Sequence, residues 1–233
     1  MPTAISAVFW HNTLLTFLGS ISPLTTHTFL KVESLAFERN DAVLFQPVDF
    51  ALKAGEAMQL VGDNGSGKTT LFQLLTGILS PSSGSISYCG QPFNDCRYEY
   101  LSDVLYIGHQ SGVKAALTVT ENLRWMSPNN TSSEKISTAL EAVGLSEYAQ
   151  INCANLSAGQ KRRVALARLM TAQAKLWFLD EPLTSLDKQG VELIERCMSQ
   201  HLQQGGAILF SSHQDLAQLK TRNYRLEPFV EVA

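Results

Sequence analysis

The chain has 233 residues, of which 45% are hydrophobic and 17% charged, with a formal net charge of −3 at pH 7 and a pI of about 6.0. This composition indicates one globular domain, or one domain with a subdomain, and excludes a largely disordered chain. The lack of a basic surplus argues against nucleic acid as a partner. The 4 cysteines form no C-x-x-C pair, so we expect free thiols in a reducing compartment instead of a disulfide framework or a zinc site.

The opening stretch, 1–29, contains no Lys, Arg, Asp or Glu. Its most apolar window, 4–24, is interrupted by His11, Asn12 and several Ser and Thr residues, which makes it a poor transmembrane helix. The missing basic residues argue against a signal peptide and against a mitochondrial presequence. We expect an unstructured or weakly structured extension that is dispensable; a membrane-surface contact is the alternative.

Residues 30–233 are predicted to form the globular domain. Alternating or short apolar runs predict strands over 30–35, 43–45, the stretch up to Leu52, 57–61, 85–89, 175–179 and 207–210. The last two are continuous apolar runs, as in a parallel sheet that is covered on both faces.

A glycine-rich segment between the strand 57–61 and a predicted helix matches G-x-x-x-x-G-K-[ST] at every specified position. Its glycines allow successive N–H groups to converge on an anion, and the helix adds its positive end. Lys68 would reach the β- and γ-phosphates of ATP, and the Thr69 hydroxyl would hold Mg²⁺. The predicted phosphate site comprises Gly62, Asp63, Asn64, Gly65, Ser66, Gly67, Lys68, Thr69 and Thr70.

A helical insertion is predicted over about 111–163, between two parts of an α/β core. Thr118 with Glu121, and Ser157 with Gln160, have the spacing of capping boxes, so a helix should begin directly after Thr118 and another after Ser157. A further helix is predicted from about Lys188.

Polar residues follow three of the predicted strands. Asp180 and Glu181 come directly after 175–179, His213 lies just beyond 207–210, and Gln110 follows an apolar run that starts at Val104. Ligands of open α/β sheets bind at such strand ends. Asp180 would bind Mg²⁺, and Glu181 would polarise the water that attacks the γ-phosphate.

From about Leu30 to its end, the chain resembles the nucleotide-binding subunit of an ATP-binding-cassette transporter. The resemblance implies an α/β fold with a P-loop NTPase (RecA-like) core, an antiparallel β edge subdomain and an inserted helical subdomain. It identifies Gln110 as the Q-loop, 156–160 as the signature, Asp180-Glu181 as the Walker B end, 185–187 as the D-loop and His213 as the switch histidine. Ala158 replaces the usual first glycine of the signature, a small-for-small change.

The same resemblance implies the roles of the site residues and an ATPase activity. The implied catalytic residues are Lys68, Glu181 and His213. Further contacts to the nucleotide would come from Gln110, Ser157, Gly159, Gln160 and Asp187. The implied Mg²⁺ ligands are Thr69, Gln110 and Asp180. It also implies a head-to-tail dimer in which each signature caps the ATP held by the other copy. The usual adenine-stacking aromatic is not evident, and Phe37 or Arg39 would substitute for it.

A narrower resemblance concerns the partner. The segments 106–114, 120–123, 156–168 and 212–214 resemble the cytochrome c maturation haem-exporter ATPase. This implies a peripheral subunit on the cytoplasmic face of the inner membrane that powers haem export or release of a haem chaperone. Integral membrane subunits would contact it around 110–120. The alternatives are the ATPase of another exporter or importer, for lipoproteins or small solutes, and a non-transport cassette ATPase that acts on ribosomes or DNA.

Overall fold

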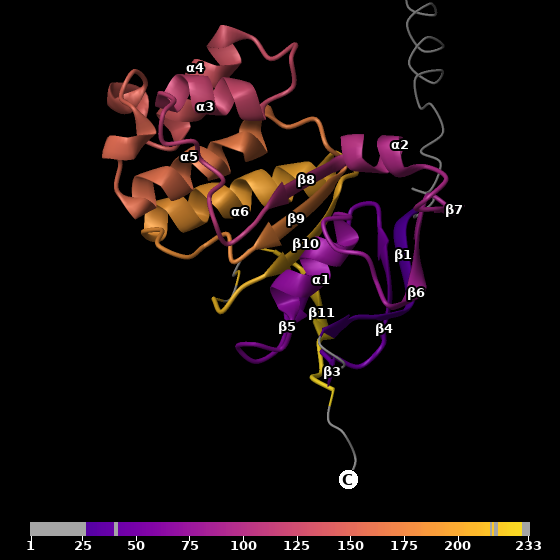
Figure 1. Cartoon of the computed structure of the whole chain (residues 1–233). Coiled ribbons are helices and arrows are strands. Elements are labelled where there is room, and N and C mark those ends of the chain that lie inside the picture. Colours follow the sequence, from indigo (N-terminus) through magenta and orange to yellow (C-terminus); the bar gives the residue numbers. More distant parts are fainter. Residues whose placement is uncertain (1–26, 40–41, 215, 217–218, 230–233) are drawn as a thin grey trace, which may run out of the picture.

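A computed structural model describes residues 27–39, 42–214, 216 and 219–229 (Figure 1). Most of the predicted extension, 1–26, lies outside the described residues. Within the described ranges, no helix combines the length and the apolar composition needed to cross a membrane.

A 5-stranded parallel sheet forms the core, in the order β11-β5-β10-β9-β8. Its strands are β5 (Ala57–Val61), β8 (Val104–Ile107), β9 (Leu176–Asp180), β10 (Ala207–Ser211) and β11 (Thr221–Arg225). Every residue of β9 and β10 is buried, as their apolar sequences predict.

Alternate side chains of β9 enter two different cores, because successive residues of a strand point to opposite faces. Leu176 and Phe178 pack with α1 (Lys68–Leu75) and the second sheet. Trp177 and Leu179 pack with α5 (Ala158–Thr171) and α6 (Lys188–Gln203). The parallel sheet is therefore covered on both faces, with α1 between the two sheets (Figure 1).

An antiparallel 4-stranded sheet, in the order β4-β1-β6-β7, packs against α1. Its strands are β1 (Thr28–Ala36), β4 (Val48–Lys53), β6 (Ser83–Tyr88) and β7 (Gln91–Pro92). A separate 2-stranded ribbon joins β2 (Glu38–Arg39) to β3 (Ala42–Val43), and α2 (Arg97–Ser102) precedes β8. The predicted antiparallel edge subdomain is confirmed, and β1 begins 2 residues before the predicted start at Leu30.

The helical layer consists of α3 (Val119–Met126), α4 (Ser133–Ala142), α5 and two 3₁₀ turns, Ser146–Tyr148 and Cys153–Asn155. Its apolar side chains form a core of their own. Both predicted capping boxes are present, at Thr118 and at Ser157. The fully buried Asn122 side chain bonds to Lys114, Leu117 and Thr118, and thereby fixes the loop that leads into α3.

Candidate ATP site

The last glycine of the loop between β5 and α1 sets the path of the backbone there. Gly67 is the N-cap of α1 with φ of 98°, and a Cβ there would lie 2.7 Å from Phe45 Cδ1. Only glycine meets both conditions without strain. The Lys68 ammonium folds back across the loop and donates to the carbonyl oxygens of Gly62 (2.7 Å) and Asp63 (3.0 Å).

The loop leaves donors free for an anion. The first backbone hydrogen bond of α1 runs from Leu71 N to Gly67 O (2.8 Å), and none in the described chain uses the N–H groups of Lys68, Thr69 or Thr70. Free N–H groups and the positive helix end together favour a phosphate. The buried Ser66 hydroxyl also has no hydrogen-bond partner among the described residues.

Asp180, at the end of β9, is tied to the loop and to the neighbouring strand. Its Oδ2 accepts from Thr69 Oγ1 (2.7 Å) and its Oδ1 from Ser211 Oγ (2.9 Å), and the residue is only 2% exposed. A carboxylate and a hydroxyl that lie this close provide the oxygen ligands that Mg²⁺ prefers. The predicted pair of Thr69 and Asp180 is therefore brought together.

Glu181 and His213 also meet, as the strand-end argument predicts. His213 Nε2 lies 3.5 Å from Glu181 Oε1, which is buried and makes no hydrogen bond to the described residues. Glu181 has φ of 51°, a left-handed conformation that is uncommon for a non-glycine residue. Its N–H donates to Ser211 Oγ (3.0 Å). A carboxylate oxygen without a partner can accept a proton from water.

Gln110 is the third predicted ligand of Mg²⁺. It follows β8 and is exposed, and no hydrogen bond joins it to Thr69 or Asp180 in the described structure. It lines a hollow of about 370 Å³ together with residues of the signature helix and of the D-loop, namely Ala158, Lys161, Thr184 and Ser185. The structure thus places Gln110 beside the signature of its own chain.

The signature residues cap their own helix. Ser157 Oγ accepts from Gln160 N (3.2 Å), and Gln160 Oε1 accepts from Ser157 N (2.9 Å). Among the described hydrogen bonds, none links 157–160 to the phosphate loop. In the described structure, hydrogen bonds therefore do not connect the signature to the phosphate loop of its own chain.

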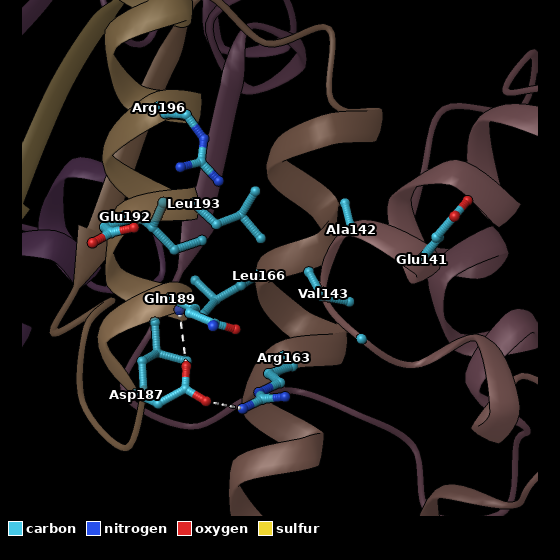
Figure 2. Close-up of a pocket in the computed structure, with 14 residues that line it drawn as sticks. Glu141, Ala142, Val143, Arg163, Leu166, Asp187, Gln189, Glu192, Leu193 and Arg196 are labelled. Carbon is cyan, nitrogen blue, oxygen red and sulfur yellow. Dashed lines mark hydrogen bonds and ion pairs between the residues drawn. The ribbon is translucent and has the colours of Figure 1, made fainter.

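Asp187 joins the D-loop to two helices (Figure 2). Its Oδ1 accepts from Gly190 N (2.9 Å) and caps α6, while its Oδ2 accepts from Arg163 Nη2 of α5 (2.9 Å). This pair borders a groove of about 430 Å³ between α6, α5 and the C-terminal end of α4 with the turn that follows it. No residue of the phosphate loop lines that groove, so it is not the ATP site.

Two residues of the site were not predicted. The Arg162 guanidinium donates to the backbone carbonyls of Gly108, Asp180 and Glu181, and Ser211 bonds to both acidic residues. A weak sequence signal existed for Arg162, which lies 4 residues before the buried Leu166 and so on the apolar face of α5.

The two candidates for the adenine contact differ in exposure. Phe37 is half-buried and packs against the core, whereas Arg39 in β2 is exposed. Stacking of an adenine needs an accessible planar face, which the Arg39 guanidinium offers.

Residues 45–184, more than half of the 233 residues, match the ABC transporter family. The cytochrome c biogenesis ATP-binding export protein CcmA of Pseudomonas putida is 46% identical over 204 residues, which cover 87% of this chain and 96% of that protein. Its namesake from Escherichia coli K12 is 43% identical over 199 residues, covering 84% and 96%.

Solved structures agree at the level of the fold. A structure of the ATP binding subunit of an ABC transporter superposes with a TM-score of 0.71 at 25% identity, and the match covers 80% of each chain. The two-sheet architecture and the phosphate loop before α1 therefore occur in a chain that resembles ABC transporter subunits along most of its length. The chain belongs to the ABC transporter family, as an ATP-binding subunit that hydrolyses ATP.

Proposed function

We propose that this chain powers haem export, or release of a haem chaperone, in cytochrome c biogenesis. The observation that carries the proposal is the identity of 46% to a cytochrome c biogenesis export protein over 96% of that relative's length. Two of the segments that carry the narrower resemblance meet at one hollow, which His109 and Gln110 line together with Ala158 and Lys161.

The proposed division of work within one site follows from the contacts. Lys68 and the free N–H groups of α1 bind the phosphates, and Glu181 takes a proton from the attacking water, with His213 Nε2 at 3.5 Å from Oε1 of that carboxylate. Thr69 and Asp180 would hold Mg²⁺, with Gln110 joining them only after the loop behind β8 moves. When bound, Mg²⁺ neutralises charge that develops on the phosphate oxygens.

We propose that the complete site forms between two copies, head to tail. The signature makes no hydrogen bond to the phosphate loop of its own chain within the described structure, while the N–H groups of Ala158 and Gly159 are left without backbone partners there. Such a helix end is an anion site. The signature would cap ATP held by the other copy, with Ser157, Gly159, Gln160 and the D-loop Asp187 at the shared surface.

Integral membrane subunits are the second proposed partner, with this chain peripheral on the cytoplasmic face of the inner membrane. Support comes from the exposed surface formed by α3 and the loop that precedes it. The Trp125 side chain is 63% exposed, and Lys114 Nζ lies 4.2 Å from its ring centroid. Large exposed aromatic residues are typical of protein interfaces.

Two experiments test these proposals. Glu181→Gln should bind ATP, form a stable dimer by size exclusion and turn over at a small fraction of the wild-type rate; Lys68→Ala, which loses the phosphate contact, should stay monomeric with ATP. Wild-type hydrolysis by Glu181→Gln would overturn the assignment of that residue.

The export role is tested separately in cells. The tagged chain should co-purify with integral membrane subunits, and its depletion should stop haem attachment to c-type cytochromes, with rescue by wild type and not by Glu181→Gln. Recovery of ribosomes, or normal cytochrome c levels after depletion, would contradict the export role.

A further inference from the structure

The Arg162 guanidinium joins the signature helix to two other segments of the site. Its Nη1 donates to the Gly108 carbonyl (2.6 Å), shortly before Gln110. Its Nη2 donates to the carbonyls of Asp180 (3.0 Å) and Glu181 (2.7 Å). The residue is 6% exposed and lies in α5, whose first turn is the signature. One buried side chain thus contacts the Gln110 loop and the end of β9.

The partners of this cation are backbone carbonyls. Burial lowers the pKa of Arg162, and the nearby Asp180 and Glu181 carboxylates oppose that shift. Burying a guanidinium is costly unless its donors are satisfied, and here carbonyls satisfy both terminal nitrogens, while the buried Nε has no partner among the described residues. Because carbonyls do not titrate, these bonds persist whether Glu181 is ionised or has accepted a proton. The contact fixes backbone position and leaves the carboxylate free.

Glu181 needs such support because its backbone is strained. A non-glycine residue at φ of 51° costs about 1–3 kcal/mol relative to an ordinary conformation. Ser211 Oγ holds its N–H, and Arg162 holds its carbonyl oxygen. Relaxation of this residue would turn its side chain away from His213.

We propose that Arg162 is a positioning residue for ATP hydrolysis, which holds Glu181 in the conformation that directs its carboxylate toward His213 and ties the Gln110 loop to the same point. This inference rests on the proposed role of Glu181, which Glu181→Gln tests on its own. Lysine cannot replace the arginine, because one ammonium lacks the planar fork that reaches Gly108 and Glu181 together.

The first test compares two conservative variants of the full chain. Arg162→Lys should lower kcat at least about tenfold, with the KM for ATP and the affinity for a fluorescent ATP analogue within about threefold of wild type, because the phosphate loop is untouched. The matched control is Arg168→Lys, also in α5, where the guanidinium donates to the Tyr106 carbonyl (3.2 Å). The control should keep kcat within about twofold. Equal kcat losses in both variants would refute the proposal.

A double-mutant cycle separates positioning from general damage to the fold. If Arg162 acts through Glu181, adding Arg162→Lys to Glu181→Gln should change the residual single-turnover rate by less than about twofold. The proposal would be overturned if the rate loss of the double variant equalled the product of the losses of the two single variants. It would also be overturned if Arg162→Lys lowered the affinity for the ATP analogue as much as it lowered kcat. Should Arg162→Lys prove insoluble, Arg162→Gln, which keeps one amide donor, enters the same cycle.

Discussion

Replacing Ser211 with alanine should remove one hydrogen bond from each of the two acidic residues at the end of β9. The Ser211 side chain is fully buried, and its hydroxyl donates to Asp180 Oδ1 (2.9 Å) and accepts from Glu181 N (3.0 Å). The variant leaves the Glu181 N–H without a partner and leaves Asp180 with the Thr69 hydroxyl alone.

The magnitude follows from the two lost bonds. A bond to a charged group contributes about 1.5–3 kcal/mol and a neutral one about 1 kcal/mol, which gives roughly 3 kcal/mol of lost stability. For a chain of this size, that corresponds to a fall in Tm of roughly 6–12 °C. We expect kcat to fall at least about tenfold, because Glu181 loses the bond that holds its strained backbone from the N-terminal side.

The assay pairs steady-state ATPase kinetics with thermal unfolding and uses Ser127→Ala as a matched control. Ser127 is also buried, and its hydroxyl lies 2.7 Å from both Leu123 O and Thr171 Oγ1 in the helical layer. The control should lose comparable stability and keep kcat within about twofold below its Tm. Wild-type kcat in Ser211→Ala, or an equal kcat loss in Ser127→Ala, would refute the reasoning.

Two further predictions concern the phosphate loop and pH. Gly67→Ala should abolish ATP binding in a fluorescence titration, because its Cβ would meet Phe45 at 2.7 Å, whereas Gly90→Ala, at a similar φ of 81° with nothing within 4 Å, should bind ATP normally; equal binding by both variants would contradict the steric argument. Burial of the His201 ring, stacked 3.9 Å from Trp177, lowers its pKa from 6.5 to about 4. The unfolded chain therefore binds more protons between those values, so stability should fall as the pH falls from 6.5 toward 4, by at most about 3 kcal/mol. His201→Phe should flatten this part of the urea-unfolding profile, and an unchanged slope would show that other groups cause it.

Local patterns were sufficient for most of the fold. The capping boxes at Thr118 and Ser157 depend on residues three positions apart, and the buried runs of β9 and β10 need no knowledge of distant partners. The elements α2 and β11 were not predicted. The first has only 6 residues, and the second, Thr221–Arg225, is a polar strand with no fully buried residue whose existence depends on its pairing with β5.

The residues of the site also differ in whether a local sequence pattern could predict them. Parallel strands deliver their carboxyl ends to one edge, so the meeting of Asp180, Glu181 and His213 near Thr69 could be predicted from order alone. Arg162 and Ser211 act through bonds to the backbone of other segments, and such bonds leave no motif in the sequence. Whether Gln110 bonds to Thr69 or Asp180, which it does not do in the described structure, depends on the path of its loop, and spacing does not determine that path.

The capping box at the start of α5 has a consequence for association. Because Ser157 and Gln160 already fix each other, the first turn of the helix is ordered before any second copy arrives. In the proposed dimer, ATP would meet a preorganised surface, and little binding free energy would be consumed in restricting loop and side-chain freedom.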